Sequence, residues 1–234
     1  MGTAATNSWL VRRVQNAIQD GFTRAYDTLK VDADRYLAHL RRAHGLPVDS
    51  FRQIQSIHPN VLDNIADQTI SAAVKLATAE GLGLGLGGIF TAIPDIGVLS
   101  AITMRMIQKL SLVYGFEYST DEEIADLWIA AASAAGVNMG KDLLEKQVIE
   151  RFVPRVIERI AIKAGAEITE KWVARMVPII SCIAGGTLNY YFVRQWGRRA
   201  KRHFRDRHMR IRHRDELPPV DHRAELPPFD ETRS

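Results

Sequence analysis

Apolar positions near the start of the chain recur every three or four residues, which is the spacing of one helix face rather than of a strand. Asn7 or Ser8 can cap this helix, and the pattern continues, with a break, toward Leu40. His44-Gly-Leu-Pro47 then ends the segment. We therefore predict an N-terminal helical arm over residues 1–60, with a buried stripe at Leu10, Val14, Ile18, Phe22, Ala25 and Leu29.

The helical period returns after Pro59 and leads directly into a glycine-rich run at residues 81–88. Glycines four positions apart let helix backbones approach closely, so we expect this run to serve helix packing. A further helix is expected from near Asp95 to Tyr114. Thr120 and Glu123 have the spacing of a capping box and predict another helix, through about Ala135.

Pro154 and Pro178 are expected to break the remaining helical pattern. No segment outside residues 81–87 alternates as a strand would, so the chain is predicted to be all-α, a compact multi-helix bundle. Within it, residues 61–213 are expected to form the main helical domain.

A nine-residue unit containing Leu-Pro-Pro occurs twice after Arg214. Paired prolines favour extended polyproline conformation, so we predict a disordered Pro-rich tail over residues 214–234. Such a tail is either a linker end or a peptide that binds a partner protein.

The composition, 46% apolar and 25% charged over 234 residues, is that of a globular protein. Cys182 is the one cysteine, which excludes a disulfide framework within the chain. The first residues lack an uninterrupted apolar stretch of the kind that signal peptides carry. These features favour a cytoplasmic location.

Charge is concentrated between Arg194 and Arg214, where ten Lys or Arg residues accompany one acid, Asp206. This segment carries +9 while the whole chain carries +4, so the remainder carries −5. A basic stretch of this kind is either a solvated helix end or a footprint for an anionic surface. The residues expected to bind such a surface are Arg194, Arg198, Arg199, Lys201, Arg202 and Arg205.

Two segments are long and apolar enough to raise the question of a membrane. Residues 81–104 contain one charged residue, Asp95, and residues 176–193 contain none. Their lengths are close to the roughly 20 residues that span a bilayer. Packing in the core of the bundle is the interpretation we favour, with a transmembrane hairpin as the alternative.

Motifs for cofactors and catalysis are incomplete. Gly83 to Gly88 fits GxGxxG, but the preceding segment is helical and no acid follows at the required distance, so no cofactor is predicted. His203, His208 and His213 are five residues apart, which prevents shared metal coordination on a helix and makes them members of the basic face. No catalytic or metal-binding residue is therefore assigned. Polar residues set among apolar ones form one candidate polar site: Asp95, Arg105, Gln108 and Asn189.

Several of these motifs in combination resemble the EcsC family of bacterial helical proteins. They are the glycine-rich lead at 81–88, Ile93-Pro-Asp-Ile96, Arg105-Met-Ile-Gln108, Tyr114-Gly-Phe, Pro178-Ile-Ile, Gly185-Gly186, Asn189-Tyr190 and a basic segment ending at Phe204. The resemblance extends from about Ile70 to Arg210. Thr91-Ala92 stand where an acid is expected ahead of Ile-Pro. The family resemblance implies a helical fold and a membrane neighbourhood, with a membrane transport complex as one partner.

Three functions are consistent with these features. The favoured one is a non-enzymatic, peripheral membrane protein that binds anionic lipid or a membrane transport complex. The second is nucleic-acid binding through residues 194–214, with Trp196 and Phe204 available for stacking. The third is a hydrolase-type enzyme with a polar site around Asp95.

Overall fold

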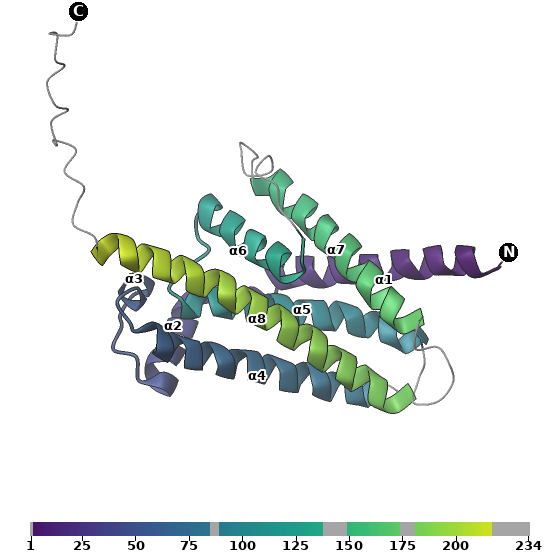
Figure 1. The fold of residues 1–234 in the computed structure, drawn as a ribbon, viewed down its shortest axis with the longest axis horizontal. Coiled ribbons are helices and arrows are strands. Elements are labelled where there is room, and N and C mark those ends of the chain that lie inside the picture. Colours follow the sequence, from purple (N-terminus) through teal and green to yellow (C-terminus); the bar gives the residue numbers. More distant parts are fainter. Residues whose placement is uncertain (1, 85–88, 138–148, 174–180, 217–234) are drawn as a thin grey trace, which may run out of the picture.

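A computed structural model describes residues 2–84, 89–137, 149–173 and 181–216. These residues form helices joined by turns and contain no strand, which confirms the all-α prediction (Figure 1). The helices are α1 (Gly2–Asp27), α2 (Ala33–His44), α3 (Phe51–Ile54), α4 (Pro59–Leu84), α5 (Ile89–Val113), α6 (Asp121–Ala134), α7 (Ile149–Val173) and α8 (Ser181–Glu216).

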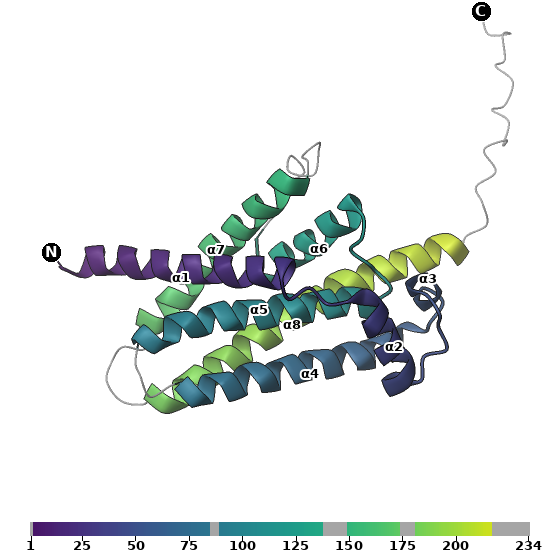
Figure 2. The same cartoon turned by 180° about the vertical axis from the view of Figure 1, so that it is seen from behind.

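Helices α4, α5 and α8 run along the long axis of the molecule and pack against one another (Figures 1 and 2). Helix α1 lies against α5 and α7, and α6 packs between α7 and α8. The short helices α2 and α3 sit at the end of the bundle where α8 finishes (Figure 1). Helix α8 has 36 residues, about 54 Å at 1.5 Å per residue, and therefore contacts several otherwise separate elements.

The predicted stripe on α1 is buried at five of its six positions, and each of the five is at most 4% exposed. Leu29 is 43% exposed because α1 ends at Asp27, so residue 29 no longer follows the helical period. The helix begins at Gly2, ahead of the predicted caps Asn7 and Ser8. The predicted break between α1 and Leu40 follows Asp27, and α2 begins after Asp32, whose side chain caps it by accepting from the backbone N–H of Arg35.

The capping box before α6 is confirmed, since the Thr120 and Glu123 side chains each bond to the other's backbone N–H. The stop after α5 is also as expected. Gly115 has φ +84°, a left-handed conformation, and a Cβ there would lie 2.8 Å from the carbonyl oxygen of Phe51. Glycine is therefore required at this turn on both grounds.

The expectation that Pro154 breaks the helical pattern was wrong, because it lies inside α7. It is the sixth residue of that helix, so its missing N–H removes a single bond near an end that already has free donors. Pro94 has the same position in α5, which begins at Ile89 rather than near Asp95. Pro178 lies outside the described residues.

Helix α8 continues to Glu216, so residues 214–216 are helical and not part of a tail. The rest of the predicted tail, residues 217–234, lies outside the described residues. The glycine-rich run is described only in part, since residues 81–84 end α4 and 85–88 lie outside.

One helix within the described residues is long and apolar enough to span a membrane, over Ile96–Val113. Two-thirds of this window is buried inside the bundle. A core helix of any large bundle meets the same criterion, so the window gives no indication of where the protein resides.

Candidate functional site

Helix α8 carries ten of the chain's 31 Lys and Arg residues, and the structure divides them between two faces. Several point into the bundle and meet acids on α4 and α6, while others point to solvent. The inward group includes three of the six residues predicted to bind an anionic surface: Arg199, Lys201 and Arg205. The outward group includes the other three: Arg194, Arg198 and Arg202.

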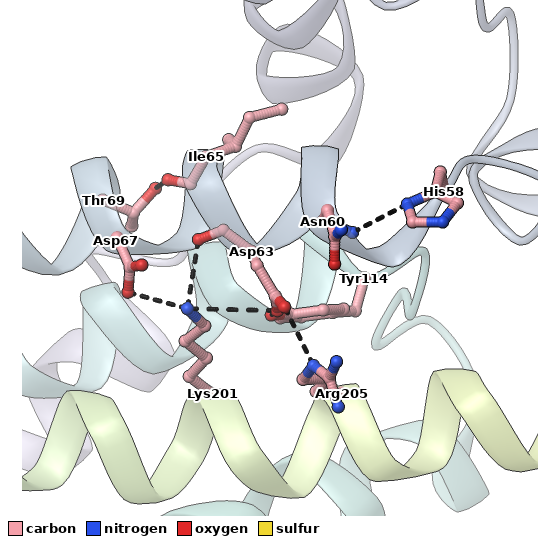
Figure 3. A network of polar contacts seen from close by, with 9 residues as sticks. All are labelled: His58, Asn60, Asp63, Ile65, Asp67, Thr69, Tyr114, Lys201 and Arg205. Atoms are coloured by element: carbon pink, nitrogen blue, oxygen red, sulfur yellow. Dashed lines mark hydrogen bonds and ion pairs between the residues drawn. The ribbon is translucent and has the colours of Figure 1, made fainter.

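Asp63 of α4 is the centre of the larger inward cluster (Figure 3). The Nε of Arg205 donates to its Oδ2 at 2.9 Å, and the hydroxyl of Tyr114 donates to its Oδ1 at 2.5 Å. Lys201 lies between Asp63 and Asp67, with its Nζ donating to the backbone oxygen of Asp63 at 3.2 Å and to Oδ1 of Asp67 at 2.8 Å. These contacts join α4, the end of α5 and α8 at one point.

The cluster shifts the pKa values of its members in opposite directions. Burial alone would raise the pKa of Asp63, but hydrogen bonds from Tyr114 and Arg205 and the charges of Lys201 and Arg205 lower it overall. The pKa of Tyr114 is raised by burial and by its hydrogen bond to Asp63. Asp63 is therefore ionised and Tyr114 is a neutral donor at neutral pH, which is the arrangement of a structural ion cluster.

A second inward cluster surrounds Asp126 of α6. Arg207 forms an ion pair with its carboxylate, and the Nε2 of His203 lies 3.6 Å from it. The Arg207 guanidinium also lies over the Phe116 ring, 4.2 Å from its centroid. Arg199 donates to the carbonyl of Ala134 at 3.1 Å, so α8 holds the C-terminal end of α6 as well.

The outward face of α8 presents Arg194, Arg198 and Arg202 at successive four-residue intervals, and all three are exposed. None of them forms an ion pair with an acid in the described part of the chain. The guanidinium of Arg194 lies over the ring of Tyr190, 5.3 Å from its centroid, and Tyr190 is itself 39% exposed. We call these three arginines the α8 arginine stripe.

A groove of about 420 Å³ separates this stripe from α4. Arg194 and Arg198 line one side, and Lys75 adds a further cation from α4. Asp67 lies at the edge of the groove, where it is neutralised by Lys201.

The aromatic residues of the basic stretch belong to the core. Trp196 is 3% exposed and Phe204 is fully buried, so the expectation that they stack on nucleic-acid bases was wrong. His208 is fully buried too, with Nδ1 3.2 Å from the carbonyl oxygen of Tyr114, so it is not a member of the basic face. The helical period places these positions on the side of α8 that meets α5 and α6.

The candidate polar site is not a single cluster. Arg105 donates to the carbonyl of Leu29, and the Oε1 of Gln108 accepts from the backbone N–H of Val31 at 3.1 Å. Both side chains thus fix the segment between α1 and α2. Asp95 precedes them on α5 by ten and thirteen residues, about 15 and 20 Å along the axis, and the side chains of Asp95 and Asn189 lie outside the described residues.

Comparison with known proteins supports the resemblance drawn from the motifs. A model of the EcsC protein family matches residues 3–209. The chain belongs to the EcsC family. Its similarity to the protein EcsC of Bacillus subtilis (strain 168) is 25% identity over 207 residues, covering 86% of this chain and 85% of that protein. An uncharacterised protein of the same organism, YdbA, is 23% identical over 157 residues, 62% of this chain and 58% of YdbA. No solved structure matches the chain.

The family match includes residues 3–60, which carry none of the motifs that indicated it. In this EcsC family member, those residues supply α1, whose contacts with α5 and α7 make it part of the same bundle.

Sequence reasoning missed the acids that form ion pairs with basic residues of α8. Asp63, Asp67 and Asp126 lie 77 or more positions away from their partners on α8, and no local spacing connects them. The sequence did hold one indication of the pairing. Asp63 and Asp67 have the same four-residue spacing on α4 as Lys201 and Arg205 have on α8, so the two pairs can face each other. Among the described residues, no group of three potential ligands could hold a metal ion.

Proposed function

We propose that this EcsC family protein is a non-enzymatic, peripheral membrane protein that binds anionic phospholipid headgroups through the α8 arginine stripe. The observation that carries the proposal is the division of cations on α8. Lys201 and Arg205 form ion pairs with Asp67 and Asp63 of α4. In contrast, Arg194, Arg198 and Arg202 are exposed and have no acidic partner in the described residues.

Electrostatics and side-chain chemistry both support a membrane surface as the target. Each Lys or Arg near an anionic leaflet contributes about 1 kcal/mol, so the three arginines together supply about 3 kcal/mol. Tyr190, at the N-terminal end of the stripe, is the kind of amphipathic aromatic residue that lies at headgroup level. Asp206 ends the stripe, so the footprint is confined to the first half of the basic segment.

The enzyme hypothesis has less support. Arg105 and Gln108 hold the backbone at Leu29 and Val31, which is a structural task. Nucleic-acid binding through the same stripe would have to depend on phosphate contacts alone, because Trp196 and Phe204 are in the core. Lipid is therefore the surface we favour.

The test is co-sedimentation of the full chain with vesicles that contain no protein, composed of phosphatidylcholine alone or with 30% phosphatidylglycerol. We expect binding to the anionic vesicles only. The triple variant Arg194→Gln, Arg198→Gln, Arg202→Gln should weaken it by about 3 kcal/mol, roughly a hundredfold.

The matched control removes three arginines with the same spacing from α7: Arg151→Gln, Arg155→Gln, Arg159→Gln. These residues are exposed as well, but Glu150 and Glu158 lie among them, so a footprint for an anionic surface is not expected there. Equal losses in the two triple variants would show a response to net charge alone and would contradict the proposal. Absence of binding by the folded wild type would overturn it and would direct attention to a membrane transport complex or to nucleic acid.

A further inference from the structure

A cavity of about 500 Å³ lies between α2, α4 and α5. Gln68, Thr69 and Leu76 of α4 line it. They lie on a different face of α4 from the residues that line the groove beside the α8 arginine stripe. The cavity is therefore separate from the surface to which we assign membrane binding.

Four basic side chains line this cavity: Arg105 and Lys109 from α5, and His39 and His44 from α2. No Asp or Glu is among the described residues that line it. The hydroxyls of Tyr36 and Thr69 add two further polar groups and lie 3.4 Å from each other. The polar part of the cavity is thus cationic and rich in donors.

Lys109 is a cation of this cavity that has no counter-ion among the described residues. It is half-buried and forms no hydrogen bond or ion pair with any described residue. Burial and the charge of Arg105 both lower the pKa of Lys109, which means that its surroundings disfavour the ammonium form. A half-buried cation without a partner is costly unless an anion approaches it.

Contacts with other residues position Arg105 and the two imidazoles, which line the same cavity as Lys109. One N–H of Arg105 is anchored by the carbonyl of Leu29. His39 and His44 meet edge to face, with ring centroids 5.7 Å apart, and the centroid of the Tyr36 ring lies 5.7 Å from that of His39. Burial and the proximity of His39 lower the pKa of His44, so it is neutral at neutral pH and available as a hydrogen-bonding group.

The remaining lining is apolar and includes Leu76, Ile102 and Met106. A cavity with a cationic part and an apolar part fits an amphipathic ligand, with the anion at Lys109 and an apolar group against α4 and α5.

We propose that this cavity binds a phosphate monoester carried on a short apolar group. Two neighbouring cations, Arg105 and Lys109, match the two negative charges of a phosphate monoester, whereas a carboxylate would leave one cation unpaired. The histidines and hydroxyls can satisfy the remaining phosphate oxygens. The ligand class fits a soluble ester or the headgroup of a phosphomonoester lipid, and the chemistry recognised is the same.

The first experiment titrates hexyl phosphate into the full chain by calorimetry at pH 7. We expect saturable one-to-one binding in the wild type. Lys109→Met keeps the length and apolar stem of the side chain and should weaken binding at least tenfold, while Lys109→Arg should retain it within threefold. Lys75→Met, which removes one cation from the other face of α4, is the matched control and should bind as the wild type does. Circular dichroism checks that each variant is folded.

Absence of saturable binding in the wild type, or equal affinity in the two methionine variants, would overturn the proposal. A second experiment distinguishes a lipid headgroup from a soluble ester. It measures binding to vesicles that contain phosphatidic acid, using the α8 triple variant with and without Lys109→Met. Loss of vesicle binding on adding Lys109→Met, with competition by hexyl phosphate, identifies a lipid headgroup. Loss of hexyl phosphate binding with no effect on vesicles identifies a soluble ester.

Discussion

The Tyr114 hydroxyl donates a hydrogen bond of 2.5 Å to Asp63, although the two residues lie 51 positions apart in the sequence. This contact joins the end of α5 to α4 and lies within reach of Arg205 on α8 (Figure 3). One carboxylate therefore holds three long helices of the bundle together.

Removing either partner of this contact should destabilise the protein to different extents. Tyr114→Phe removes one hydrogen bond to a charged group and should lower the free energy of unfolding by about 1.5–3 kcal/mol. Asp63→Asn should cost more, because Arg205 then loses its charged partner and Lys201 keeps only Asp67. Urea unfolding measures both, and Asp49→Asn on the surface is the control. A smaller loss for Asp63→Asn than for Tyr114→Phe would contradict this assignment.

Buried His208 should make stability depend on pH. Burial lowers the pKa of His208, and the charge of Arg212 lowers it further, although the hydrogen bond to the carbonyl of Tyr114, the carbonyl of Ile57 and the charge of Asp63 act in the opposite sense. The unfolded chain therefore binds a proton below about pH 6.5 that the folded chain does not, so stability is full above that pH and falls as the pH decreases. His44 contributes with the same sign.

Urea unfolding at pH 7.5, 6.5 and 5.5 tests this. His208→Gln removes the titration and should reduce the pH dependence over this range without abolishing it, because His44 remains. If the free energy of unfolding depends on pH equally in the wild type and the variant, His208 is not responsible.

Two glycines at the crossing of α1 and α5 should respond in opposite ways to alanine. A Cβ on Gly21 would overlap the carbonyl oxygen of Gly97 and lie 2.8 Å from the Cβ of Ser100, so Gly21→Ala should force the helices apart at a cost of about 1–3 kcal/mol. A Cβ on Gly97 would meet only the carbonyl oxygen of Ala17, at 3.4 Å. Gly97→Ala should be neutral or stabilising by up to about 1 kcal/mol, since alanine favours a helix. Urea midpoints distinguish the two, and equal destabilisation would contradict the close approach.

The second half of α8 should be required for folding. A chain ending at Val193 lacks Trp196, Ala200, Phe204 and His208, all of them buried in the core. We expect it to lose cooperative unfolding, whereas a chain ending at Glu216 should keep it. Cooperative thermal unfolding of the shorter chain would show that these core positions are dispensable. For this reason substitutions, and not truncation, are the proper test of membrane binding.

The local parts of the fold were predictable from the sequence. The stripe from Leu10 to Ala25 and the capping box at Thr120 depend on spacing within a few residues, and both are present as expected. The effect of Pro154 was overestimated because a proline near the start of a helix costs less than one in its interior. The close helix packing is seen at single glycines such as Gly21 and Gly197, which no repeated motif marks.

The functional surfaces were less predictable. Cations occur around the whole circumference of α8, so the sequence alone could not separate Lys201, which is bound by acids, from Arg202, which is exposed. The distinction depends on Asp63 and Asp67, which only the fold brings to α8. The cavity at Lys109 was equally hidden, because its lining comes from three helices.

Helix α8 has a buried face and an exposed basic face, and this limits which sequence changes it can accept. Successive residues of a helix are rotated by 100°, so inserting a single residue near Arg199 would rotate everything that follows by that angle. Phe204 and His208 would leave the core, and Arg205 would lose Asp63. Substitutions at Arg194, Arg198 and Arg202 carry no such constraint. The length of α8 should therefore be held fixed in evolution while the chemistry of its outer face is free to change.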